Sequence, residues 1–219
     1  MVDQTAYLAV TWAGALLLWL GFLAFYDGRR RPLREPEIEA FLATLGPRMV
    51  ETGNDAARLR AFLEADDGRE FVMVNLVRTR PGAVTDPASG ETLDGREWLR
   101  RYSDPFLRTL MRRGGHPLFV GRKVGGYIDA WNTPEDPGWS LVGTMRYRSR
   151  RDLVAMAGDP AFRTAHPAKS LGIETTFSFP TQREIAFYAS PRVTIGLALA
   201  LAAAMGHIMI VTFGWGGAA

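Results

Sequence analysis

The sequence contains no cysteine, which excludes disulfide bonds, thiolate nucleophiles and cysteine-bound metal centres. Lysine is nearly absent, since only Lys123 and Lys169 stand among 26 basic side chains. Arginine therefore carries almost all of the positive charge, a bias typical of GC-rich bacterial genomes. Several short motifs are also missing: there is no Ser/His/Asp series, no phosphate-binding glycine loop and no HxxxH or HExxH spacing. These absences speak against hydrolases, nucleotide-dependent enzymes and histidine metal sites.

Charge is absent from two long segments, Ala6–Tyr26 and Val193–Phe213, which contain no Asp, Glu, Lys or Arg. As helices they would each be about 31 Å long, close to the roughly 30 Å of a bilayer core. Neither segment alternates like a strand of a membrane barrel. The sequence therefore predicts two transmembrane helices. The alternative is a pair of buried helices in a soluble protein.

Positive charge flanks the inner ends of both segments, whereas the outer ends carry only Asp3. By the positive-inside rule, residues 27–192 lie in the cytoplasm, and both termini lie in the periplasm. We expect a bacterial inner-membrane protein whose first arginine cluster rests on anionic lipid headgroups. The cluster comprises Arg29, Arg30, Arg31 and Arg34.

Between the two segments, the chain is long enough for one globular domain. Basic and acidic residues are interleaved there, which gives no indication of nucleic-acid binding. The predicted divisions are an outer N-terminus 1–5, a transmembrane helix 6–26, a juxtamembrane and amphipathic helical segment 27–70, a folded domain 71–183, a link 184–192, a second transmembrane helix 193–213 and an outer C-terminus 214–219.

Hydrophobic periodicity and turn residues predict the elements of the central part. Pro36–Ala65 is predicted as two helical pieces, broken at Gly46-Pro47 and at Thr52-Gly53-Asn54. The predicted strands are Phe71–Arg78, Leu118–Val124, Trp139–Arg148 and Glu174–Phe179, the last of them stopped by Pro180. A loop follows the first strand. The first predicted helix is Asp94–Arg113, stopped by Gly114-Gly115. The second is capped by Ser149, restarts at Asp159-Pro160 and ends at Pro167.

The resulting order, β-α-β followed by β-α-β, is typical of the ferredoxin-like α+β fold. Such a domain has a four-stranded antiparallel sheet with both helices on one face. We therefore expect the other face to be covered by a second copy, by a partner, or by the N-terminal helices. An uncovered apolar face would otherwise be an interaction surface or an aggregation hazard.

Three segments carry a family resemblance: FVMVNLVRTR, EWLRRYSDPFLRTLMRRGGHPLFVGRKVG and WSLVGTMRYRSRRDLVAMAGDPAFRTAHPAKSLGIETTFSF. The sequence over about Phe71–Phe179 resembles the dimeric α+β barrel superfamily, in particular an uncharacterised bacterial branch related to antibiotic-biosynthesis monooxygenase-like and stress-responsive barrel domains. The resemblance implies sheets that pair face to face and a pocket between sheet and helices. Members include cofactor-free oxygenases, haem-handling enzymes, small-lactone isomerases and proteins without known activity, so the fold alone decides no chemistry.

Four residues are candidates for such a pocket, namely Asn75, Tyr102, His116 and His166. Each also has a structural interpretation. Asn75 can bond a neighbouring loop, Tyr102 and Tyr147 can lie at the edge of the core, and both histidines can contact carbonyls at helix ends. No catalytic residue and no metal site is predicted.

In the second apolar segment, small residues and one histidine share a helix face at 4-3-4 spacing: Gly196, Ala200, Ala203 and His207. Small residues let another helix approach closely in lipid. An intramembrane histidine is a functional hypothesis by default. His207 is expected to form a hydrogen bond across helices; the alternative is that it ligates a haem or a pigment. Otherwise no cofactor is predicted.

These features favour a non-catalytic accessory subunit that stabilises a larger bacterial inner-membrane complex, photosynthetic or respiratory. Its partners would be other membrane subunits, anionic lipids or a second copy in a homodimer. The alternative is a membrane-tethered barrel enzyme or sensor that acts on a lipophilic small molecule, quinone-like or haem-like. A pocket lined by convergent polar groups would favour the alternative.

Overall fold

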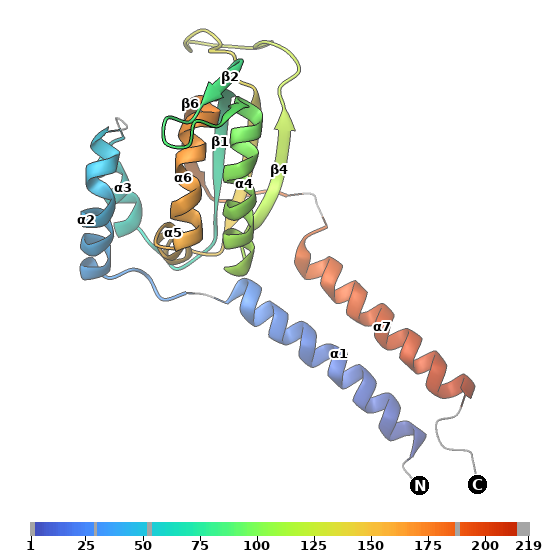
Figure 1. Ribbon diagram of the computed structural model, residues 1–219. Coiled ribbons are helices and arrows are strands. Elements are labelled where there is room, and N and C mark those ends of the chain that lie inside the picture. Colours follow the sequence, from blue (N-terminus) through green and yellow to red (C-terminus); the bar gives the residue numbers. More distant parts are fainter. Residues whose placement is uncertain (1–2, 29, 52–53, 187–188, 214–219) are drawn as a thin grey trace. The chain divides into compact units, whose positions relative to one another are not determined.

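The computed structural model describes residues 3–28, 30–51, 54–186 and 189–213 (Figure 1). The chain forms two compact units, which we describe separately. One unit joins the two ends of the chain, Met1–Gly28 and Ile185–Ala219. The other is the folded domain, Arg29–Glu184.

The first unit is a helical hairpin of α1 (Gln4–Asp27) and α7 (Pro191–Phe213). Both helices are long and apolar enough to cross a membrane, and most of their large apolar side chains are exposed. They are antiparallel, since the Gln4 amide at the start of α1 donates to the carbonyl of Ile210, 3.1 Å away near the end of α7. At the opposite end of the hairpin, Arg192 binds the Asp27 carboxylate at 2.6 Å.

The folded domain begins with helices α2 (Glu35–Glu51) and α3 (Ala56–Glu64). The predicted break at Gly46-Pro47 is wrong, because α2 continues through both residues. A proline costs a helix one backbone hydrogen bond and a steric clash, and here the flanking turns stay helical. The second predicted break, at Thr52-Gly53-Asn54, falls mostly outside the described residues.

Helices α2 and α3 are attached to the rest of the domain by apolar and ionic contacts. Ile38 and Leu63 are buried, and the Phe62 ring lies 5.2 Å from that of Phe71. On α2, Glu37 accepts a hydrogen bond of 2.7 Å from Arg151. This bond holds the pKa of the Glu37 carboxyl well below its usual range.

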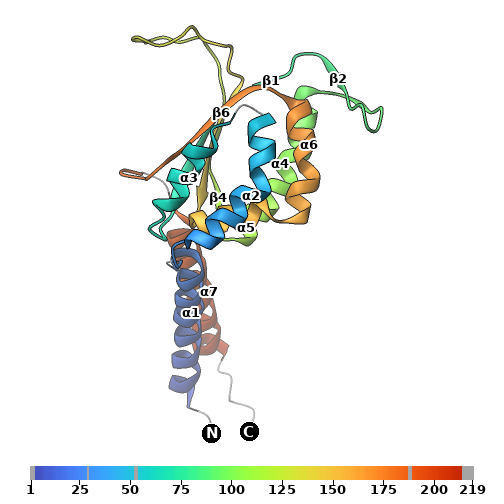
Figure 2. The same cartoon turned by 90° about the vertical axis from the view of Figure 1, so that its left-hand side faces the viewer.

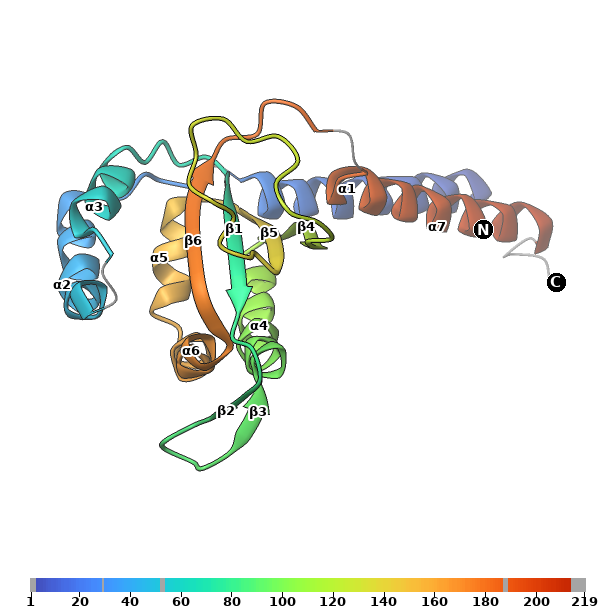
Figure 3. The ribbon, with the colours of Figure 1, turned by 90° about the horizontal axis from the view of Figure 1, so that it is seen from above.

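A mixed α+β architecture with a four-stranded antiparallel sheet follows, as predicted (Figures 1 and 3). The strand order is β4-β5-β1-β6, which is the split βαβ pattern of a ferredoxin-like fold. The strands are β1 (Phe71–Thr79), β4 (His116–Arg122), β5 (Leu141–Tyr147) and β6 (Ile173–Thr181). The predicted loop after β1 contains a short hairpin, β2 (Ala83–Thr85) and β3 (Thr92–Asp94), which projects from the sheet (Figures 2 and 3).

Helices α4 (Gly95–Arg112), α5 (Arg150–Ala157) and α6 (Pro160–Gly172) cover one face of the sheet. Their starts and stops follow local chemistry, because Asp94, Ser149 and Asp159 cap the three N-termini, and Gly114 after α4 has a φ of +76°. Helices α4 and α6 lie side by side (Figure 3). A Cβ atom on Gly172 would lie 2.6 Å from the backbone nitrogen of Leu99, so this close approach requires glycine.

Two predicted stops at proline are wrong. Helix α6 continues through Pro167 to Gly172, so His166 lies inside a helix rather than at its end. Strand β6 continues through Pro180, which pairs with Met73. A strand at a sheet edge tolerates proline, because one side of it has no neighbour to receive an N–H.

Candidate functional site

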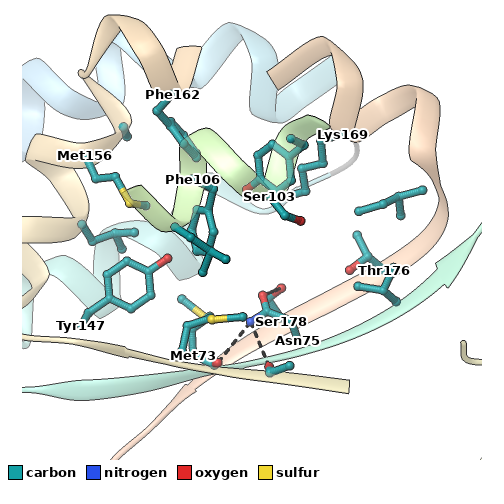
Figure 4. A pocket seen from close by; sticks show the side chains of 18 of the residues that line it. Met73, Asn75, Ser103, Phe106, Tyr147, Met156, Phe162, Lys169, Thr176 and Ser178 are labelled. Carbon is teal, nitrogen blue, oxygen red and sulfur yellow. Dashed lines mark hydrogen bonds between the residues drawn. The ribbon is translucent and has the colours of Figure 1, made fainter. Parts of the chain in front are cut away.

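A cavity of about 440 Å³ lies between the sheet and the helices of the folded domain (Figure 4). Its walls are mainly apolar and come from every helix of the domain as well as from the sheet. Even the N-terminal helices contribute, through Phe41, Leu45 and Leu59. The polar side chains of the wall are Asn75, Tyr102, Ser103, Tyr147, Lys169, Thr176 and Ser178.

Asn75 forms part of the floor of this cavity, in the middle of β1. Its amide nitrogen donates to the carbonyl oxygens of Met73 and Gly143, both at 3.1 Å (Figure 4). Its amide oxygen accepts a hydrogen bond of 2.7 Å from the Ser178 hydroxyl. Asn75 thus lines the cavity but is already paired with the sheet on both sides.

Tyr102 and Tyr147 differ from Asn75 in this respect. Neither hydroxyl takes part in any hydrogen bond of the described residues, although both side chains line the cavity. Burial raises the pKa of both tyrosines, and the nearby Tyr102 raises that of Tyr147 further. Both therefore remain neutral hydroxyl groups that can donate a hydrogen bond to a ligand.

Lys169 is the one cation among the described residues of this wall, and the sequence prediction did not include it. It lies on α6, its side chain is half-buried, and burial lowers its pKa. The ammonium is 5.6 Å from the centre of the Tyr102 ring. One signal was available in the sequence, because this chain places arginine at nearly every basic position and lysine at only two.

A second cavity of about 470 Å³ adjoins the first and shares six residues with it, namely Leu45, Ala157, Phe162, Lys169, Ile173 and Thr176. His166 lines this second cavity, with its ring 5.9 Å from that of Phe162 and 6.2 Å from that of Tyr102.

His116 lies elsewhere, as the first residue of β4, with Nδ1 2.8 Å from the carbonyl oxygen of Pro117. Burial lowers its pKa. The structure therefore brings Asn75 and Tyr102 into one cavity and His166 into the next, and it leaves His116 outside both.

In the helical hairpin, three of the four residues of the predicted helix-packing face meet α1 of the same chain. A Cβ atom on Gly196 would lie 2.8 Å from the Trp19 indole nitrogen, and Ala203 is 4% exposed. The Trp12 indole donates to Nδ1 of His207 at 3.3 Å. Ala200 is exposed. The close helix approach and the histidine hydrogen bond are thus found within the chain itself.

The predicted headgroup arginines are placed in different settings. Arg29 lies outside the described residues. Arg30 is half-buried, Arg31 is paired with Glu37 at 2.9 Å, and Arg34 is exposed. Within the described ranges, no group of three or more His, Asp or Glu side chains is arranged to hold a metal ion.

Comparison with known proteins shows the fold of the domain. No family model matches the chain, and no curated protein matches it. The chain is similar to the crystal structure of RPA0582, a protein of unknown function from Rhodopseudomonas palustris. The two sequences are 23% identical, and the match covers 59% of this chain and 94% of that chain with a TM-score of 0.51. The methylated form of RPA0582 gives 24% identity, 59% and 91% coverage and the same TM-score of 0.51.

A dimeric protein of unknown function and ferredoxin-like fold from Bacteroides fragilis is also similar, with 13% identity, 52% and 96% coverage and a TM-score of 0.30. These likenesses concern architecture only.

Proposed function

We propose that this protein binds an amphiphilic small molecule in the cavity between the sheet and the helices. The observation that carries the proposal is a mainly apolar cavity with two tyrosine hydroxyls and one ammonium that lack hydrogen-bond partners in the described chain. Its volume of about 440 Å³ falls within the range of small-molecule sites, about 300–1,000 Å³. Folded interiors otherwise contain few voids larger than a water molecule.

A lipophilic, quinone-like molecule fits this chemistry. A neutral tyrosine hydroxyl can donate to a carbonyl oxygen, and the side chains of Leu99, Phe106 and Met156 offer contacts to an apolar ring or chain. No histidine lines this cavity among the described residues, which favours a quinone-like ligand over haem. Among the described residues of the wall, no nucleophile is hydrogen-bonded to a base, so binding or sensing suits the site better than catalysis.

In this proposal the hairpin of α1 and α7 anchors the domain in a bacterial inner membrane, with the domain in the cytoplasm and both termini in the periplasm. The arginine-rich flank supports that orientation. The domain would be a membrane-tethered member of the dimeric α+β barrel superfamily, near its antibiotic-biosynthesis monooxygenase-like branch. Ligands that partition into lipid would be concentrated close to their site.

Binding can be tested with the full chain in phosphatidylcholine nanodiscs and phenylnaphthylamine, an uncharged probe that fluoresces in apolar sites. Ser103→Phe places a ring in the cavity, and we expect it to weaken probe binding by about tenfold or more. Ser89→Phe adds the same ring to the exposed β2–β3 turn and should leave the affinity unchanged. Equal binding by the wild type and both variants would reject the proposal, provided that circular dichroism shows all three folded.

A second candidate is the accessory subunit of a larger inner-membrane complex, photosynthetic or respiratory. The specific observation is the outer face of the sheet, where Phe119, Phe177 and Phe179 are each more than 40% exposed. Cross-strand partners share a face, and Val74 pairs with both Thr144 and Phe179. This face is uncharged at its centre, so a second copy can meet it across a two-fold axis without repulsion.

In this second candidate, a homodimer formed through the outer face would then join other membrane subunits. Mass measurement of the native assembly in mild detergent tests it. A lone monomer without other subunits would reject both the dimer and the accessory role. Other proteins bound without a second copy would reject the dimer only.

A further inference from the structure

Lys169 is in an unusual position for a lysine. It extends from α6 toward the cavity, where it faces the strands across the apolar space (Figure 4). Its ammonium belongs to no ion pair or hydrogen bond of the described residues. Its one described contact of a polar kind is the face of the Tyr102 ring, 5.6 Å away. Desolvation penalises an unpaired charge, so a carboxylate beside a cation in an apolar wall would stabilise it.

The charges around Lys169 do not supply that carboxylate. Among the described residues, the wall of the first cavity contains no Asp or Glu. The described wall of the adjoining cavity contains Glu174, whose carboxylate binds Arg78 at 2.9 Å. Two further cations, Arg80 and Arg163, line that second cavity. The charges of the described residues that line the two cavities are therefore positive in balance.

Two further donors of the wall also favour a negatively charged acceptor. The hydroxyls of Tyr102 and Tyr147 are uncommitted donors, and both tyrosines stay neutral because burial raises the pKa of each. Three donors thus approach one apolar space from different sides, Tyr102 from α4, Lys169 from α6 and Tyr147 from β5. An acceptor that carries negative charge makes the strongest hydrogen bonds with such a set.

We propose that the ligand of this cavity is an amphiphilic organic acid, with Lys169 as the counter-ion of its anionic group and the apolar wall around its body. This inference rests on the proposed function and narrows its amphiphilic ligand to an acid, in place of an uncharged quinone. It also explains why the cavity keeps a cation that no side chain of the described residues neutralises. Lys169 is a binding residue in this scheme, and no chemical step is assigned to it.

Two fluorescent probes of similar shape separate charge from hydrophobicity. Anilinonaphthalene sulfonate is anionic, and phenylnaphthylamine is the uncharged compound without the sulfonate. Both are titrated against the full chain in phosphatidylcholine nanodiscs. The key variant is Lys169→Met, which keeps the length of the stem and removes the charge. The matched control is Lys123→Met, which removes the other lysine of the chain, a residue of the β4–β5 connection that pairs with Asp136.

We expect Lys169→Met to weaken binding of the anionic probe by about tenfold or more and to change that of the uncharged probe by less than about twofold. Lys169→Arg should restore most of the anionic affinity. Lys123→Met should behave like the wild type with both probes. Thermal unfolding of each variant shows that it is folded before its affinity is interpreted.

Equal loss of both probes in Lys169→Met, or loss of neither, would overturn the anionic ligand and leave the cavity as a site for uncharged molecules. Failure of both probes to bind the wild type, or binding that Ser103→Phe leaves unchanged, would instead reject the proposed function itself. If Lys123→Met weakens binding of the anionic probe as much as Lys169→Met does, the effect is one of net charge. That result would also overturn the inference.

Discussion

The helical hairpin and the cavity of the folded domain differ in whether polar side chains in apolar surroundings have hydrogen-bond partners. In the hairpin the indole nitrogens of Trp12 and Trp19 both donate across the helix pair, to His207 and to the carbonyl of Arg192. In the cavity, the hydroxyls of Tyr102 and Tyr147 have no such partner among the described residues. Paired polar groups hold two elements together, whereas unpaired ones leave binding capacity for a ligand.

The two regions also differ in how closely they are packed. Gly196 lets α1 and α7 approach until no Cβ fits, whereas the domain keeps a space of about 440 Å³. Substitutions in the hairpin should therefore cost stability, while substitutions of the unpaired cavity groups should cost binding. Four predictions test this difference, beginning with the largest expected effect.

Gly196→Val should separate α1 from α7, because its side chain would collide with the Trp19 indole. We expect a destabilisation of the hairpin by about 2–3 kcal/mol, the upper range for overpacked sites. The matched control is Ala200→Val, on the exposed side of α7, which should change little. Thermal unfolding in nanodiscs, followed by tryptophan fluorescence, measures both. A similar loss in the two variants would show that the packed face has been misassigned.

Lys169→Met should stabilise the ligand-free protein by about 1 kcal/mol at neutral pH, the cost of an uncompensated polar group discounted for the partial exposure of the side chain. The sign follows from linkage. Burial lowers the pKa of Lys169 in the folded state below its ordinary value of 10.5. The unfolded state therefore takes up the proton first as pH falls.

This advantage of Lys169→Met should be absent above pH 10.5, grow as pH falls below that value, and level off once the folded protein is protonated too. Chemical denaturation of the wild type and the variant at several pH values gives the difference. A wild type more stable than Lys169→Met at neutral pH would show that an internal partner already neutralises the lysine.

His207→Leu should cost the hairpin roughly 0.6 kcal/mol, the average for a hydrogen bond between helices in a membrane. The Trp12 indole would lose its acceptor, and Trp12→Phe should cost about the same. A double-mutant cycle of the two substitutions gives the coupling energy. Coupling near zero would mean that His207 serves something other than α1, such as the pigment or haem ligation considered from the sequence.

Tyr147→Phe should change the stability of the domain by less than about 0.5 kcal/mol, because the hydroxyl has no partner to lose. It should still weaken binding of an oxygen-bearing ligand through the missing donor. The comparison residue is Asn75, whose three hydrogen bonds make Asn75→Leu more costly, about 1–3 kcal/mol. Calorimetry on both variants would contradict this account if Tyr147→Phe proved the more destabilising.

Much of the fold followed from local signals. The strand at Phe71, the caps at Ser149 and Asp159 and the stop at Gly114 are all present as predicted, because each depends on a few neighbouring residues. The errors came from applying the proline rule too strictly. Pro167 continues a helix that packs closely on α4, and Pro180 sits in an edge strand.

The candidate site was predicted less well. Asn75 and Tyr102 were proposed as pocket residues and both line the cavity, but Asn75 already makes three hydrogen bonds and His116 lies outside both cavities. Lys169 and Tyr147 were not proposed as site residues. A sequence pattern shows which residue types are present. These two side chains matter because their polar groups have no hydrogen-bond partner among the described residues.

The sequence alone determined two apolar helices near the ends of the chain and a β-α-β repeat between them, because hydrophobic periodicity and capping act over a few residues. Only the tertiary structure decided which polar groups are paired and which face an open space. That distinction depends on contacts between segments far apart in the chain, such as Tyr102 on α4 with Lys169 on α6. Desolvation and hydrogen bonding are set by those neighbours, and a linear sequence does not specify them.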